Sequence, residues 1–165
     1  MGAGKSTVAN YIRDTFEYTK LAFGSKIHSE CKLHGKETRN EMQNYGQMMR
    51  KIFGKNVWCD YVYNQSLKYN RVVIEDGRQL NEYDYYIDLG YLPVGVITND
   101  DIRIERLKKR INYVFDPTTS QHETEIQART CVNKCNIQLY NNSDDINDLI
   151  KEIENKIGQY LGGVI

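Results

Sequence analysis

The first seven residues, MGAGKST, limit the folds open to this chain more than any other stretch. Gly4, Lys5 and Ser6 match the end of the pattern G-x-x-x-x-G-K-[ST]. In that pattern backbone amides hold phosphate groups, the lysine reaches the terminal phosphates and the hydroxyl binds Mg²⁺. We therefore expect ATP and Mg²⁺ as cofactors, with Lys5 in catalysis and Ser6 on the metal. The residues expected to bind ATP are Gly2, Ala3, Gly4, Lys5, Ser6 and Thr7.

The first glycine of this pattern would fall before Met1, and so would the buried strand that leads into such a loop. We expect the natural reading frame to continue upstream through an apolar strand and Gly-x, with Met1 as an internal methionine. The sheet would then lack a central strand in this chain. Unpaired strand edges would weaken both stability and triphosphate binding.

The composition indicates one domain without a strong electrostatic field. The chain has 165 residues, a length that supports a single hydrophobic core, so we treat residues 1–165 as one domain. Basic and acidic residues balance at 22 each, which argues against a nucleic-acid or membrane partner. No apolar run reaches the ~20 residues of a membrane span, and no secretory segment is visible, so we expect a cytoplasmic protein.

The four cysteines admit two interpretations. Cys131 and Cys135 have three residues between them, with no second pair and only scattered histidines. Structural zinc usually needs four ligands at tighter paired spacing, so free thiols in the interior are the favoured interpretation and a zinc site the alternative.

Apolar spacing predicts strands alternating with helices. Val8, Ile12 and Phe16 recur every fourth residue, which indicates a helix beginning inside the glycine loop. The expected strands are 20–23, 71–76, 92–98 and 136–142. The expected helices are 26–34, 38–53, 57–69, a stretch after Asp76 that ends at Leu89, 101–112 and one after a Ser143 cap. Residues 113–130 are predicted as a loop and a short helix. The pattern favours an α/β fold with a parallel sheet flanked by helices in three layers, its first strand missing.

A pair of acids ends the clearest predicted strand. Glu75 and Asp76 follow the apolar run at residues 72–74. Magnesium on a loop serine usually has a carboxylate at the end of a neighbouring buried strand, so Asp76 is the expected metal ligand and catalytic acid.

With GAGKST, QNYGQMMRKIFGKNVW and VVIEDGRQLNE in this order, the chain resembles the phage-type deoxynucleoside monophosphate kinases, P-loop kinases related to dephospho-coenzyme A kinase. The resemblance implies the P-loop kinase fold, a helical monophosphate-binding region at about 25–70 and a flap at about 103–130. It implies phosphoryl transfer from ATP to a small-molecule nucleotide, with two arginines on the monophosphate. The positions that match the substrate side are Gln43, Arg50, Trp58, Arg78 and Glu82.

Three further residues complete the expected site. Arg106 and Arg110 lie in a basic helix where such kinases stabilise the transferred phosphoryl group, and a solvated helix face is the alternative. Asn142 follows the last strand, where this family places a turn against the adenine.

Other functions stay open at this point. One alternative is a dephospho-coenzyme A kinase or another small-molecule kinase, and another is a catalytically impaired nucleotide-binding protein. The sequence does not decide the oligomeric state, and a homodimer is one of the open alternatives.

Overall fold

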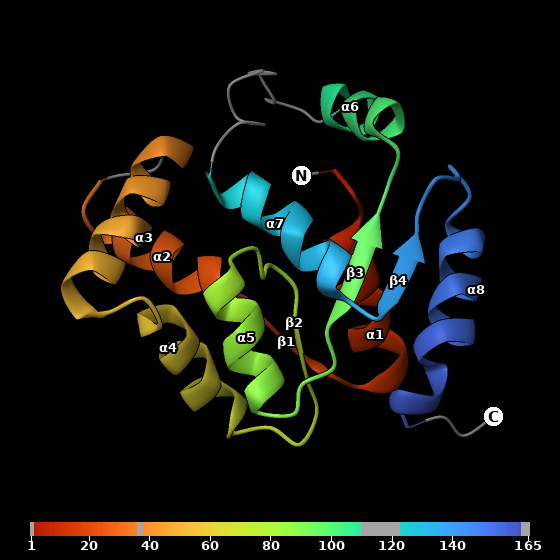
Figure 1. The fold of residues 1–165 in the computed structure, drawn as a ribbon, viewed down its shortest axis with the longest axis horizontal. Coiled ribbons are helices and arrows are strands. Elements are labelled where there is room, and N and C mark those ends of the chain that lie inside the picture. The colour runs from red at the N-terminus through yellow and green to blue at the C-terminus, as the bar shows by residue number, and fades with distance from the viewer. Residues whose placement is uncertain (1, 36–37, 110–122, 163–165) are drawn as a thin grey trace.

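The computed structural model describes residues 2–35, 38–109 and 123–162. Helices and strands alternate along most of this chain (Figure 1). The strands are β1 (Thr19–Leu21), β2 (Val72–Ile74), β3 (Val94–Ile97) and β4 (Ile137–Tyr140). The helices are α1 (Lys5–Phe16), α2 (Phe23–Leu33), α3 (Arg39–Phe53), α4 (Val57–Ser66), α5 (Leu80–Asp88), α6 (Asp100–Lys108), α7 (Glu123–Lys134) and α8 (Ile146–Ile157), with the 3-10 helix η2 (Gly158–Tyr160).

The strands form two separate parallel pairs. β1 pairs with β2, with Lys20 opposite Val73, and β3 pairs with β4, with Val96 opposite Leu139. In the described residues no ladder joins β2 to β3. The parallel α/β architecture is confirmed, whereas the residues that the structure describes do not confirm the single continuous sheet of a three-layer fold.

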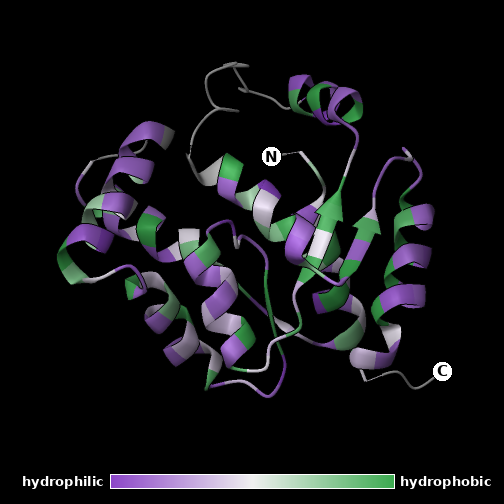
Figure 2. Ribbon diagram, in the orientation of Figure 1, coloured by the Kyte–Doolittle hydropathy of each residue, from purple (hydrophilic) through white to green (hydrophobic). Residues whose placement is uncertain are grey.

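Helices cover both faces of these strands. α1 and α8 pack on one face through a core cluster that includes Val8, Ile12, Leu139 and Ile153. α5 and α7 contact each other, and α7 lies against β3 in front of the strand, opposite α1 (Figure 1). β3 is mostly hydrophobic, whereas β4 and the helices carry both kinds of residue (Figure 2). The burial of Val8 and Ile12 confirms the predicted apolar face of α1.

A second core cluster joins the helical region to β2. Phe23, Trp58 and Tyr86 are buried here, with α2, α3 and α4 packed together. The only tryptophan donates its indole N–H to the Gly46 carbonyl over 3.1 Å, which ties α4 to the middle of α3. These helices form the predicted helical region at about 25–70.

Several predicted boundaries were wrong. Phe23 was expected to end a strand but begins α2, and Ser143 was expected to cap the last helix although Asp145 does so, accepting from the Asn147 amide over 2.9 Å. Thr38, the first residue of the helix predicted at 38–53, instead lies just before α3 and caps it reciprocally with Glu41.

Candidate functional site

The glycine loop meets the N-terminus of α1. Gly2 and Gly4 have φ of +80° and +95°, a backbone region that glycine adopts without strain. Gly4 is the N-cap, with no side-chain cap and no acidic residue in the first turn. The positive end of the helix dipole is therefore presented with Lys5, Ser6 and Thr7 around it, an arrangement that suits a phosphate anion.

Two polar residues after the third and fourth strands fix this loop. The Thr98 hydroxyl and the side-chain amide (Nδ2) of Asn141 both donate to the Ala3 carbonyl over 3.0 Å. A Cβ at Gly4 would lie 2.2 Å from Nδ2 of Asn141, so only glycine fits there. Sequence reasoning missed Thr98 and Asn141; the signal was the run of polar residues following each strand.

The neighbouring Asn142 has a structural partner. Its side-chain oxygen accepts a 2.8 Å hydrogen bond from the Asn99 amide, which joins the loops after β3 and β4. Asn142 therefore lies in the loop after β4, next to the residue that contacts the phosphate loop.

Arg106 belongs to the same network. Its guanidinium donates to the carbonyls of Asn141 and Ser143 over 2.9 and 2.5 Å. These bonds hold α6, the start of the predicted flap, to the loop that also contacts Ala3. Arg110 lies outside the described residues, as does much of the flap.

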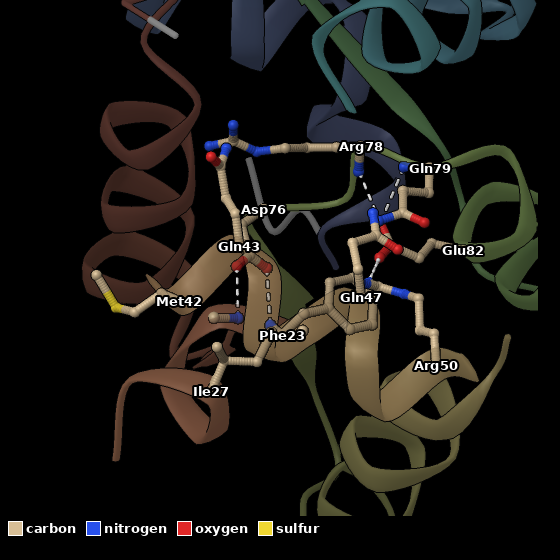
Figure 3. Close-up of a pocket in the computed structure, with 12 residues that line it drawn as sticks. Phe23, Ile27, Met42, Gln43, Gln47, Arg50, Asp76, Arg78, Gln79 and Glu82 are labelled. Atoms are coloured by element: carbon tan, nitrogen blue, oxygen red, sulfur yellow. Dashed lines mark hydrogen bonds and ion pairs between the residues drawn. The ribbon is translucent and has the colours of Figure 1, made fainter. Parts of the chain in front are cut away.

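A cavity of about 300 Å³ lies between α2, α3 and the segment after β2 (Figure 3). It brings together residues that are far apart in the sequence. Asp76 lines it, and so do four of the five residues predicted on the substrate side: Gln43, Arg50, Arg78 and Glu82. Phe23, Ile27 and Met42 add an apolar wall, and Gln47 and Gln79 were missed by sequence reasoning.

Trp58 does not line this cavity. It is buried to 4% exposure and donates a hydrogen bond to the carbonyl of Gly46, which does line the cavity. Its role in the structure is to support α3.

Arg50 and Glu82 form an ion pair at the cavity. Arg50 Nη2 lies 2.8 Å from Glu82 Oε1, and the side chains are 12% and 5% exposed. With the Gln79 amide turned so that its oxygen faces Arg50, that oxygen lies 3.2 Å from both Nη1 and Nη2. Arg50 Nε is buried and has no hydrogen-bond partner among the residues that the structure describes. One donor of this guanidinium therefore has no hydrogen bond to another described residue.

Glu82 is held by three donors. Besides Arg50, the amides of Arg78 and Gln79 donate to its second oxygen over 2.8 and 3.0 Å. Burial raises the pKa of the Glu82 carboxyl, and these hydrogen bonds and the Arg50 charge oppose that rise.

Asp76 lies at the end of β2 and contacts α2. Its two oxygens accept hydrogen bonds of 2.8 Å each from the amides of Phe23 and Gly24 (Figure 3). Burial raises the pKa of this carboxyl, and the two amide bonds act against it. Asp76 therefore caps the N-terminus of α2, and the remaining lone pairs of its oxygens are what a metal could use.

The neighbouring Glu75 has a different environment. One of its oxygens lies 3.4 Å from Lys20 Nζ, and the other is buried without a hydrogen-bond partner in the described part of the chain. The Ser6 hydroxyl and the carboxylates of Glu75 and Asp76 are oxygen donors of the kind that Mg²⁺ prefers. Across residues 2–35, 38–109 and 123–162, no group of three or more histidine, cysteine or acidic side chains forms a metal cluster of its own, and the four cysteines are unbridged thiols.

A glycine loop at a helix N-terminus, parallel strands and a cavity at the end of β2 define a P-loop nucleotide-binding domain. Residues 1–127 match the AAA domain family, so the chain belongs to that family, which includes kinases. No curated protein matches the sequence. Within the described residues, no helix combines the length and apolar character that crossing a membrane requires.

Proposed function

We propose that the protein is a nucleotide kinase that transfers the γ-phosphoryl group of ATP to a deoxynucleoside monophosphate. The observation that carries this proposal is the cavity beside β2, where two arginines from distant segments, Arg50 and Arg78, line one space. A monophosphate carries a dianionic group, and guanidinium forks bind such groups through paired hydrogen bonds.

The apolar wall of the cavity supports a nucleoside rather than a bare phosphate. Phe23, Ile27 and Met42 line it, and the amides of Gln43 and Gln47 add hydrogen-bonding groups. An apolar lining with a few polar groups is typical of a small-molecule site. Glu82 and Gln79 in this proposal orient Arg50, while Trp58 supports the helix that carries it.

ATP occupies the glycine loop in this proposal. The amides at the start of α1 and Lys5 bind its phosphates, and Ser6 with Asp76 holds Mg²⁺, which neutralises charge on the triphosphate when bound. Asn142 lies on the turn proposed for the adenine, and Arg106 and Arg110 would stabilise the transferred group.

The reaction needs no dedicated general base. An acceptor phosphate oxygen attacks the γ-phosphorus, the bond to the bridging oxygen of the β-phosphate breaks, and ADP leaves. Such transfer has a loose transition state in which positioning and charge stabilisation dominate. The chain's residues therefore act by holding the two phosphate groups in line and excluding water.

A coupled ADP-release assay tests the proposal. The four deoxynucleoside monophosphates are compared with dephospho-coenzyme A as acceptors, and Lys5→Ala serves as the inactive variant. Exposed Lys151, on α8, supplies the control Lys151→Ala. Turnover of dephospho-coenzyme A alone would overturn the acceptor assignment, and equal ADP release by the Lys5→Ala variant would overturn the assignment of the loop.

A further inference from the structure

Helix α7 contacts residues 78–80, the turn that carries Arg78 and that we name the acceptor turn. The side-chain oxygen of Gln127 on α7 accepts a 3.1 Å hydrogen bond from the amide of Leu80, the first residue of α5. One turn further along α7, the Cys131 thiol donates to the Arg78 carbonyl over 3.8 Å. Two side chains of one helix therefore hold both ends of the acceptor turn.

Glu82 holds the same turn from within α5. It accepts from the amides of Arg78 and Gln79 over 2.8 and 3.0 Å (Figure 3). The first amides of a helix have no partner inside that helix, so each needs an acceptor from elsewhere. Gln127 supplies the acceptor for Leu80 from 47 residues away in the sequence. The position of the acceptor turn is thus set jointly by α5 and by α7.

α7 is itself fixed against the strands that lead to the phosphate loop. A Cβ at Gly95 in β3 would lie 3.1 Å from Cγ1 of Val132 and 3.3 Å from its carbonyl oxygen, so strand and helix are in close contact. The side-chain amide of Gln138 in β4 donates to the same carbonyl over 3.1 Å. Directly after these two strands come Thr98 and Asn141, which bond to the loop. α7 therefore links the acceptor turn to the strands that position the glycine loop.

We propose that Gln127 is a positioning residue for the acceptor side of the reaction, whose side-chain oxygen holds the acceptor turn so that Arg78 meets the acceptor phosphate in line with the phosphate loop. The inference rests on the proposed function, because it takes the cavity that Arg78 lines as the acceptor site. Phosphoryl transfer depends on the alignment of the two phosphate groups, so an arginine on a displaced turn binds the acceptor less well. Gln127 touches neither substrate and acts through the Leu80 amide.

The ion pair of Lys134 and Asp84 supplies a matched control. It also joins α7 to α5, over 2.9 Å, but both residues lie outside the acceptor turn and outside the lining of the cavity. Lys134→Ala therefore removes a contact between the two helices without touching the turn. A variant that only loosened these helices would lower the folded fraction and the apparent kcat, with both KM values unchanged.

Steady-state kinetics with a deoxynucleoside monophosphate as acceptor test the proposal. Gln127→Leu removes the accepting oxygen, so the KM for the acceptor should rise about three- to tenfold, the effect of one hydrogen bond, while the KM for ATP stays unchanged. Gln127→Glu retains an oxygen at the same reach and should keep the acceptor KM within about twofold of the wild type. Lys134→Ala should leave both KM values unchanged.

Inorganic phosphate tests the same contact without turnover. Its binding, followed by NMR, should shift the amides of Arg78 and Gln79 at the cavity and those of Gly4 and Lys5 at the loop. Gln127→Leu should weaken the affinity at the cavity about three- to tenfold and leave the affinity at the loop unchanged. If the wild type phosphorylated no deoxynucleoside monophosphate, the proposed function would fail, and this titration would still decide the role of Gln127.

The positioning role is overturned if Gln127→Leu leaves the acceptor KM or the phosphate affinity at Arg78 unchanged, or if Lys134→Ala raises the acceptor KM equally. It is also overturned if Gln127→Glu is as impaired as Gln127→Leu, or if phosphate shifts only the loop amides of the wild type. Each of these outcomes can occur while the wild type turns over its acceptor, so failure of this inference is distinguished from failure of the proposed function.

Discussion

The guanidinium of Arg50 on α3 donates a 2.8 Å hydrogen bond to the carboxylate of Glu82 on α5, and both side chains are almost excluded from solvent. The pair joins the helical region to the segment that follows β2. Because Glu82 also accepts from the Arg78 and Gln79 amides, one carboxylate fixes the position of two arginines proposed to bind the acceptor.

Replacing Glu82 should destabilise the fold strongly. Glu82→Ala leaves the Arg50 charge buried without its partner, and such changes cost about 3–5 kcal/mol. Asp84→Ala on the same helix is the control: Asp84 pairs with Lys134 at 2.9 Å, but the side chains are 60% and 44% exposed. Exposed pairs contribute at most about 1 kcal/mol. Urea unfolding of both variants measures the difference, and equal losses would contradict a special role for the Glu82 pair.

Asp76→Asn should reduce stability even without ligands. The carboxylate accepts two amide hydrogen bonds at the start of α2, whereas an asparagine side chain would turn an NH₂ group toward one of those donors. We expect a loss of about 1–3 kcal/mol in the free energy of unfolding, the cost of an unsatisfied buried group. Asp88→Asn, at an exposed position of α5, is the control and should change it by less than about 0.5 kcal/mol.

Activity of the same variant separates capping from metal binding. If Asp76 only caps α2, the turnover of the Asp76→Asn variant per folded molecule should not increase when the Mg²⁺ concentration is raised above the level that saturates the wild type. If it also holds the metal, the concentration of Mg²⁺ required for half-maximal rate should rise. If the folded variant needed the same Mg²⁺ concentration as the wild type, the assignment of Asp76 as a metal ligand would be contradicted.

Local patterns predicted much of the fold because they report local physics. The spacing of Val8 and Ile12 identified the buried face of α1, and the apolar runs located the four strands of the described residues to within a few positions. The error at Phe23 has a long-range cause, since Asp76 caps α2 from 53 residues away. No local signal at Phe23 carries that information.

The candidate site also contains residues that the sequence predicted and residues that only the tertiary structure reveals. Residue chemistry and the resemblance identified Arg50, Arg78 and Glu82, which the fold brings to one cavity. Asn142 was predicted to contact the adenine and stays a prediction, whereas the side chain against the phosphate loop is that of Asn141, which sequence reasoning did not select. Which of two adjacent asparagines faces the loop depends on the register of β4 against β3, and that register is a tertiary property.

Gly4→Ala should impair both stability and nucleotide binding. Its φ of +95° disfavours a side chain, and the added Cβ would lie 2.2 Å from Nδ2 of Asn141. Gly90→Ala is the matched control, because Gly90 has φ of +80° with no atom within 4 Å of the added Cβ. Backbone strain alone should cost about 1–2 kcal/mol at either position, so the excess at Gly4 measures the clash.

A double variant identifies the source of that excess. In the Asn141→Ala background the clash is absent, so Gly4→Ala should then cost no more than Gly90→Ala does. ATP binding, followed by isothermal titration calorimetry, should weaken with Gly4→Ala and stay unchanged with Gly90→Ala. An equal cost of Gly4→Ala in both backgrounds would contradict the contact with Asn141.

The buried thiols should make the fold less stable in alkali. Burial raises the pKa of Cys59 from 9.0 to about 12 and that of Cys131 from 9.0 to about 11. Between pH of about 9 and the raised values, the folded chain keeps protons that the unfolded chain has released. The free energy of unfolding must therefore fall as pH rises through this window.

Thiol labelling checks the same property directly. At pH 8 the thiolates of Cys59 and Cys131 are scarce and both side chains are buried, so iodoacetamide should label them in the native chain at least about tenfold more slowly than in 6 M urea. Urea midpoints at pH 8 and pH 10 measure the stability change, and Cys59→Ala should reduce its size, because that variant lacks one of the groups that titrate. Rapid native labelling of Cys59, or a midpoint that rises with pH, would contradict the buried neutral thiol.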